Sequence, residues 1–111
     1  MDHHRLDDMI KGWFVGGFTP TALSTTACEV GLKTYPEGAF EGRHFHKVAT
    51  EVTLVVSGRV RMAGREWGTG DVVVLAPGEA TDFLALTEAV TVVVKVPGQL
   101  DDKFALEDGT A

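Results

Sequence analysis

The sequence is poor in cysteine, since Cys28 is the only one among 111 residues. A single cysteine cannot form an internal disulfide, so the pattern is not that of a disulfide-stapled secreted domain. The polar residues 1–5 lead into no apolar run of signal-peptide length. We therefore expect a protein of the reducing cytoplasm.

Long apolar runs and an excess of positive charge are missing as well. Apolar runs such as Val72–Ala76 and Val92–Val94 are far too short to cross a bilayer. Ten Lys and Arg residues stand against sixteen Asp and Glu residues, which gives a net charge of −6, and the basic residues form no run. Neither a nucleic-acid backbone nor an anionic membrane is an expected partner.

A helical pattern is absent too, because no window combines a period of 3.6 with capping residues, so helix is expected only at the ends. Short segments rich in Val and Thr alternate instead with Gly and Pro turns, which is typical of an antiparallel all-β sandwich or barrel. The expected strands are one or two within Leu23–Tyr35, the segment around His44, Val52–Ser57, Arg59–Ala63, Val72–Leu75, Thr81–Leu86 and Val90–Val96.

The length suits a single domain over residues 1–111, with the barrel over about 23–97. Residues 1–22 form an N-terminal part. Its first eleven residues are a mobile arm or a short helical turn, and the Trp and two Phe side chains that follow are expected to cover the end of the barrel or a partner subunit. Residues 98–111 form an acidic tail in which Phe104 and Leu106 could anchor loosely, with fraying beyond.

The candidate chemistry lies in one short stretch. His44 and His46 are separated by one residue, so both imidazoles project from the same face of a strand. A tight connection to the next strand could bring Glu51 back beside them. Two histidines and one carboxylate suit a divalent transition metal that keeps open positions for water or substrate.

This stretch resembles the first signature of the cupin superfamily, in which Gly, His-x-His, Glu and Gly recur at set spacings. The second signature is met only in part: Gly70 and Gly78 fit, Ala76 replaces the usual proline, and Thr81 stands where the family has a third metal-binding histidine. The resemblance is to small single-domain cupins of the conserved-barrel type, and it implies a jelly-roll barrel, a bound metal and a homodimer. The first signature is matched by Gly38, His44, His46, Glu51 and Gly58.

Strand alternation predicts which neighbours share the pocket. With Glu51 facing inward, Thr53 and Val55 face inward too, and Thr81 and Phe83 do so on the later strand. Asp82 could replace the missing ligand only if that strand is twisted at its start, because simple alternation points it outward. The terminal residues His3 and His4 could reach the site from a flexible arm.

Three other side chains lie in or near the expected strands and have two possible roles each. Cys28 is expected to be a buried small hydrophobe, and the alternative is a thiolate at the metal. Arg43 and Lys47 flank the histidines, and they are either solvated or bind a carboxylate at the barrel mouth.

The metal is expected to be one ion of Fe, Mn, Ni, Zn or Cu, all of which accept imidazole and carboxylate ligands. The resemblance implies a metal-dependent enzyme, dioxygenase-like or isomerase-like, that acts on a small organic molecule in the pocket, with Glu51 as ligand and proton acceptor. The alternative is a non-catalytic or regulatory cupin that binds a sugar-like metabolite, which the replacement of a histidine by Thr81 favours.

Overall fold

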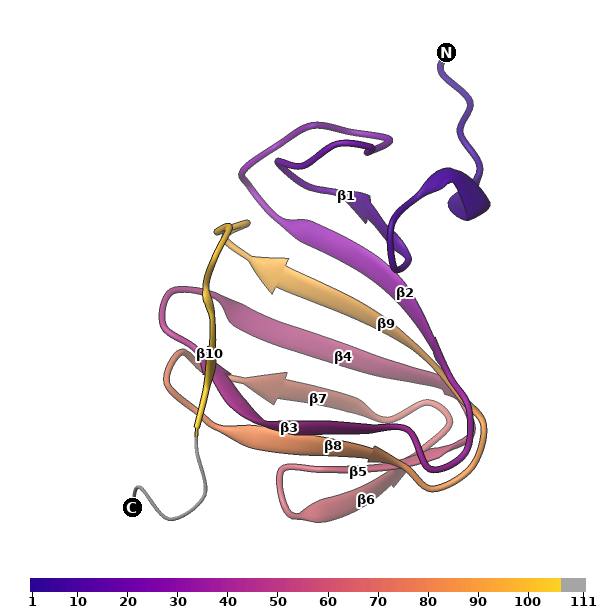
Figure 1. The fold of residues 1–111 in the computed structure, drawn as a ribbon, viewed down its shortest axis with the longest axis vertical. Helices are drawn as coiled ribbons and strands as arrows, with labels where there is room; N and C mark the ends of the chain where they lie inside the picture. Colours follow the sequence, from indigo (N-terminus) through magenta and orange to yellow (C-terminus); the bar gives the residue numbers. More distant parts are fainter. Residues whose placement is uncertain (107–111) are drawn as a thin grey trace.

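A computed structural model of the chain describes residues 1–106, so the fraying expected over residues 107–111 lies outside the described residues. Two five-stranded antiparallel sheets face each other (Figure 1). Sheet A has the order β1-β2-β9-β4-β7 and sheet B the order β10-β3-β8-β5-β6. The elements are η1 Leu6–Asp8, β1 Trp13–Val15, β2 Glu29–Tyr35, β3 Phe40–His46, β4 Thr50–Ser57, β5 Arg59–Met62, β6 Arg65–Gly68, β7 Val72–Leu75, β8 Thr81–Ala85, β9 Ala89–Val96 and β10 Lys103–Ala105.

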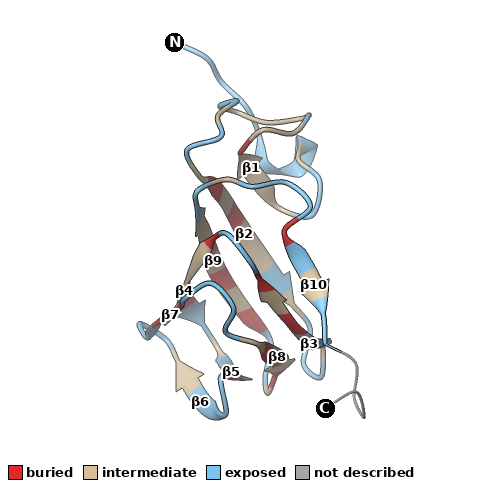
Figure 2. Ribbon diagram, turned by 90° about the vertical axis from the view of Figure 1, so that its left-hand side faces the viewer, coloured by how far each residue is buried: buried red, intermediate tan, exposed pale blue. Residues whose placement is uncertain are grey.

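Alternation decides which side chains enter the space between the sheets. On β4, Thr53 and Val55 are buried whereas Leu54 and Val56 are exposed. On β8, Thr81, Phe83 and Ala85 are buried and Asp82 is exposed. These are the predicted faces. Figure 2 shows buried segments along the strands of both sheets where the sheets face each other.

The apolar core occupies one end of this space. Val55 and Val60 are completely buried there, and burial of side chains of this size contributes roughly 1.5–3 kcal/mol each. The histidines of β3 and Glu51 of β4 lie beside this core, with Met62 and Phe83 next to them. The core residues are Val55, Val60, Met62, Val73, Leu75, Phe83, Ala85 and Ala89.

Sheet A begins earlier than the predicted barrel. β1 pairs antiparallel with β2, and the Trp13 ring lies over Gly31, where any side chain on that glycine would collide with it. Trp13 therefore packs on β2 as part of β1, the edge strand of sheet A. The first eleven residues contain a 3-10 turn, η1, and within Leu23–Tyr35 only β2 is a strand.

The tail is bound more firmly than the sequence suggests. β10 pairs with β3 over three residues, and the Phe104 ring stacks on Phe45 with ring centroids 5.7 Å apart. Lys47 lies over the same ring, at 4.2 Å from its centroid. The sheets thus extend from residue 13 to 105, beyond the predicted range 23–97. Among the described residues, no helix is long and apolar enough to cross a membrane.

Candidate metal centre

The structure places His44, His46 and Glu51 on facing inner surfaces of the two sheets. His44 and His46 lie on β3 and are 9% and 6% exposed, while the Glu51 side chain on β4 is 12% exposed. The two imidazole rings are edge-on, with centroids 5.7 Å apart, and His46 Nε2 lies 3.5 Å from Glu51 Oε1. The three predicted residues therefore lie near one another in the interior.

Backbone carbonyls determine how both imidazoles are protonated. His44 Nδ1 lies 2.9 Å from the carbonyl oxygen of Gly42, and His46 Nδ1 lies 3.1 Å from that of Asp102. A carbonyl oxygen only accepts, so Nδ1 is the donor in each ring. In a neutral ring this leaves the Nε2 lone pair available, and metal-binding histidines are commonly oriented in this way.

His46 Nε2 is the key atom, because it is buried and has no hydrogen-bond partner within residues 1–106. Its nearest charged neighbour is the Glu51 carboxylate, which is also an acceptor. Two acceptors facing each other in a low-dielectric interior need a cation between them, either a proton on the ring or a metal ion.

The donor set fits a divalent transition ion, but it does not yet enclose one. Among the described residues, no three side chains of His, Cys, Asp or Glu are arranged to hold an ion as they stand. Coordination by all three proposed ligands therefore requires a side-chain adjustment of His44 or Glu51.

Electrostatics at Glu51 favour its ionised form. Burial raises the pKa of this carboxyl group, but the neighbouring His46 imidazole and the charge of Lys95 outweigh burial and hold the pKa below its usual value. Glu51 thus presents a carboxylate, the form that binds cations.

Asp102 follows His46 by 56 residues in the sequence, and its contact with the centre was not predicted. Its carboxylate accepts hydrogen bonds from the backbone N–H groups of Lys47, Val48 and Ala49, at 2.9–3.1 Å, while its carbonyl holds His46. Burial raises its pKa, but these amides outweigh burial and lower it below its usual value. No local signal could have identified Asp102, because the contact depends on where the tail folds back.

Glu41 was missed for a different reason. Glu41 and His44 are three positions apart on β3, whereas their partners on β8, Phe83 and Thr81, are two positions apart. This bulge turns Glu41 to the same side as His44, against simple alternation. Tyr35 donates a hydrogen bond to Glu41 Oε1 at 3.2 Å, which adds a second carboxylate to the cavity wall.

A small cavity of about 40 Å³ lies between the sheets beside His44 and Glu51. It is large enough for roughly three water molecules, or an ion with water, but not for an organic substrate. Thr81 lines it, yet its hydroxyl accepts from the Ala63 N–H at 2.7 Å and donates to the Asp82 carbonyl at 2.6 Å. The other lining residues are Tyr35, Glu41, Thr53, Met62, Phe83, Thr91 and Val93.

The remaining candidates lie away from this cavity. Asp82 is exposed, as alternation predicts, and Val55 belongs to the core. His3 and His4 are exposed, and His4 borders a pocket with Leu32 on the outer side of sheet A. Neither terminal histidine is near the other two within its own chain.

The flanking residues are also outside the centre. Arg43 is exposed and lines a cleft of about 730 Å³ that His44 and Glu41 line as well, so it lies at an opening next to the centre and not among the proposed ligands. The exposed Lys47 packs on Phe104. Cys28 is half-buried and belongs to no metal-binding group among the described residues.

By sequence, the chain matches no protein-family model and no curated protein. By structure, it is similar to a double-stranded β-helix protein from Klebsiella pneumoniae (TM-score 0.67, 20% identity, 76% of this chain and 78% of that one). It is also similar to a cupin-superfamily sugar phosphate isomerase from Silicibacter pomeroyi (0.59, 23%, 63% and 50%). A third is oxalate decarboxylase from Bacillus subtilis (0.63, 22%, 73% and 24%), a protein with Mn(II) centres.

These similarities establish the fold. The chain has the double-stranded β-helix fold of these proteins, which confirms the predicted jelly-roll barrel.

Proposed function

We propose that this protein binds one divalent transition metal through His44, His46 and Glu51 and uses it to act on a small organic molecule. The observation that carries the proposal is the buried, unpartnered Nε2 of His46 at 3.5 Å from the Glu51 carboxylate. The similarity to oxalate decarboxylase and to a sugar phosphate isomerase supports it, because the former has Mn(II) centres.

The residues around the proposed metal centre would have different roles. His44 and His46 are held by carbonyl groups, so their Nε2 atoms are oriented before any ion binds. Glu51 supplies a carboxylate that can bind an ion or accept a proton. Tyr35 and Glu41 place a hydroxyl and a second carboxylate on the cavity wall, where they can orient a bound water or a substrate oxygen. A bound divalent ion would supply Lewis-acid polarisation of a substrate oxygen.

The reaction type follows from the metal. Iron, manganese or copper would favour an oxidoreductase, and zinc or nickel would favour an isomerase or hydrolytic reaction. The three-ligand set leaves coordination positions open for a substrate in either case.

The decisive experiment is elemental analysis of untagged protein purified without added metal, alongside His46→Ala and the matched control His4→Ala, which removes an exposed histidine. We expect about one equivalent of metal per chain in the wild type and in the control, and little in His46→Ala. Circular dichroism checks that the wild type and both variants are folded. No metal in the wild type, even after incubation with iron, manganese, nickel, zinc and copper salts, would refute the proposal and leave a protonated His46 as the partner of Glu51.

The alternative function is a non-catalytic or regulatory module that binds a sugar-like metabolite. Thr81 favours it, because the hydroxyl at the third histidine position is already engaged in hydrogen bonds with the backbone at Ala63 and Asp82. Metal binding without turnover of any tested hydroxy acid or sugar would support this alternative.

We also infer a homodimer in the cytoplasm. The net charge of −6 and the lack of a basic run remain consistent with a small-molecule ligand rather than a nucleic acid or a membrane.

A further inference from the structure

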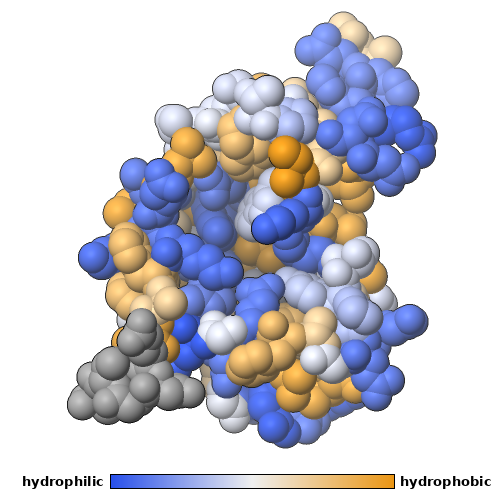
Figure 3. Space-filling model, in the orientation of Figure 1, coloured by the Kyte–Doolittle hydropathy of each residue, from blue (hydrophilic) through white to orange (hydrophobic). Residues whose placement is uncertain are grey.

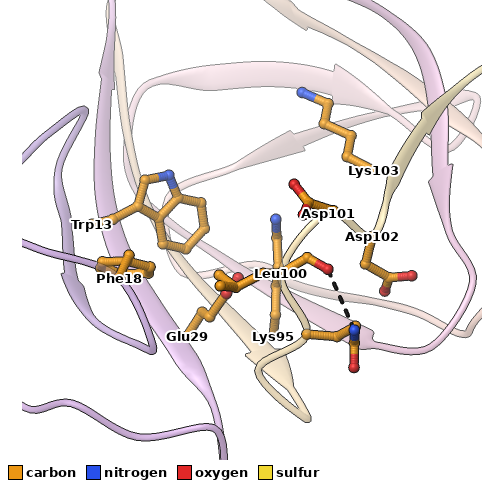
Figure 4. Close-up of a pocket in the computed structure, with 9 residues that line it drawn as sticks. Trp13, Phe18, Glu29, Lys95, Leu100, Asp101, Asp102 and Lys103 are labelled. Carbon is orange, nitrogen blue, oxygen red and sulfur yellow. Dashed lines mark hydrogen bonds between the residues drawn. The ribbon is translucent and has the colours of Figure 1, made fainter.

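A second, larger cavity adjoins the metal centre. It measures about 360 Å³ and lies between β1, β2 and β9 on one side and the segment that leads into β10 on the other. Figure 4 shows Lys95 between Trp13 and Glu29 on one side and residues 101–103 on the other. On the same face of the molecule the surface is hollowed near its middle, with hydrophilic and hydrophobic residues interspersed (Figure 3). The volume is that of a pocket for a small organic molecule.

Glu29 and Lys95 present unused charges to this cavity. Glu29 is only 6% exposed, and both residues line the cavity. They are cross-strand partners on β2 and β9, yet neither takes part in an ion pair within residues 1–106. Lys95 is half-buried and the carboxylate oxygens of Glu29 keep access to the cavity, so both groups are available to a ligand, the carboxylate as a hydrogen-bond acceptor and the ammonium as a donor.

Trp13 supplies an apolar wall of the cavity. Its ring covers Gly31, and the Lys95 ammonium lies 4.8 Å from the ring centroid. An aromatic ring beside one donor and one acceptor is a common arrangement for holding a small polar molecule with a carbon skeleton.

The cavity shares its wall with the metal centre. Lys95 on β9 is the cross-strand partner of Glu51, and Lys103 on β10 is the partner of His46. Asp102, whose carbonyl binds His46, lines the cavity as well. The backbone of Lys95 therefore lies about one strand spacing, roughly 5 Å, from that of Glu51.

We propose that this cavity binds a small carboxylic acid that also carries a hydrogen-bond donor, with its carboxylate on Lys95, its donor on Glu29 and its carbon skeleton against Trp13. The donor is a hydroxyl group, as in a hydroxy acid, or an ammonium group, as in an amino acid. This assignment rests on the proposed function, because it names the substrate class of the same centre.

Tryptophan fluorescence tests the assignment directly. The chain has two tryptophans, so Trp67→Phe leaves Trp13 as the reporter. In this background gluconate or β-alanine is titrated, with glucose as the probe that lacks a carboxylate and butyrate as the probe that lacks a donor. We expect saturable quenching by gluconate or β-alanine, and binding at least about tenfold weaker for glucose and butyrate.

Two variants assign the partners. Lys95→Met should weaken binding of the carboxylate probe about tenfold, whereas Lys47→Met, which removes an exposed lysine outside the cavity, should leave it unchanged. Glu29→Gln should weaken binding, with exposed Glu37→Gln as its control. An increase in affinity for Glu29→Gln would show that Glu29 only repels anions, and would overturn its role.

Metal analysis of the same samples separates this assignment from the function on which it rests. Lys95→Met and Glu29→Gln should retain the metal content of the wild type and a normal circular dichroism spectrum. Metal bound without any response to the probes would overturn the carboxylic-acid site alone. Probe binding in metal-free wild type and in His46→Ala would support the site while the metal-dependent function fails.

Discussion

Tyr35 shows how a single buried hydroxyl is tied to the electrostatics of the cavity. It is the only tyrosine of the chain, and its hydroxyl donates to Glu41. Burial raises the pKa of Tyr35, and the negative charge of Glu41 raises it further. The phenol thus stays protonated in the folded protein at a pH where an exposed tyrosine has ionised.

This raised pKa predicts a loss of stability at alkaline pH. Above about pH 10 the unfolded chain releases the Tyr35 proton while the folded chain retains it, so the contribution is complete below about pH 10 and falls as the pH rises. Urea unfolding between pH 8 and 11 should show a steeper decline in wild type than in Tyr35→Phe, with phenolate absorbance appearing only on unfolding. Equal slopes for the two proteins would contradict the prediction.

Thr81 allows a second test at the scale of one residue. Because its hydroxyl bonds only to the backbone at Ala63 and Asp82, Thr81→Val should leave metal affinity unchanged while lowering stability by about 1–2 kcal/mol. Thr81→His should instead raise metal affinity at least about tenfold, because it adds an imidazole beside the other ligands. Competition with a chromogenic chelator measures both. A large loss of affinity in Thr81→Val would show that the hydroxyl is a ligand after all.

Among the elements, β10 and the segment before it are short, but both position residues of the proposed metal centre. The Asp102 carboxylate binds three consecutive amides at the β3–β4 turn, and β10 then pairs along β3. The turn that separates the two histidines from Glu51 is thereby fixed by a residue from another part of the chain.

Loss of this carboxylate should destabilise the protein measurably. Asp102→Ala leaves three buried or partly buried amides without their charged partner, so we expect a decrease of about 2–4 kcal/mol in the free energy of unfolding. Urea denaturation followed by circular dichroism measures it. Asp82→Ala removes an exposed carboxylate on β8 and should change stability by less than about 0.5 kcal/mol. A similarly small loss of stability in Asp102→Ala would mean that the β3–β4 turn keeps its conformation without the Asp102 carboxylate.

Prediction from sequence succeeded where structure follows a local period. The inward positions on β4 and β8 were predicted from alternation, and the all-β class from short strands between Gly and Pro turns. The jelly-roll barrel was implied by the resemblance that Gly38, His44, His46, Glu51 and Gly58 carry. These features depend on neighbouring residues and on turn geometry, which a sequence displays directly.

Prediction failed where the period breaks or the contact is distant. The bulge in β3 brings Glu41 inward, and its one sequence signal is Gly42 inside the strand, which was not used. Strands as short as β1 and β10, three residues each, carry too little pattern to be recognised. Lys95 lay in a predicted strand, but its position beside Glu51 and Glu29 depends on strand order, which alternation does not reveal.

At the scale of the whole molecule, the outer surface of sheet A stands out. Two cross-strand rows on it are entirely aliphatic, and Val72 and Val74 at its edge are 56% and 58% exposed. A chain with a net charge of −6 meets a second copy with least repulsion at a face without charges. The rows are Val30, Val94, Val52 and Val74, and Leu32, Val92, Leu54 and Val72.

We therefore predict that the homodimer inferred above forms through this face and not through the N-terminal segment. Val74→Glu should convert the dimer to a monomer, because each copy would bury a carboxylate against the apolar rows. Leu23→Glu, an equally exposed apolar residue beside the N-terminal segment, should remain dimeric. Sedimentation velocity distinguishes the two. A dimer lost in Leu23→Glu but kept in Val74→Glu would assign the interface to the N-terminal segment.

The bond from His46 to the Asp102 carbonyl spans 56 residues of the chain, and this separation has a consequence during biosynthesis. At about 5–20 residues per second, a ribosome needs about 3 to 11 seconds to add those 56 residues, and the His46 ring has no orienting partner until they are made. A nascent chain that has exposed both histidines therefore lacks one of the two carbonyl contacts that orient their rings. Under the proposed function, we expect a metal ion to be bound only after the tail has been translated.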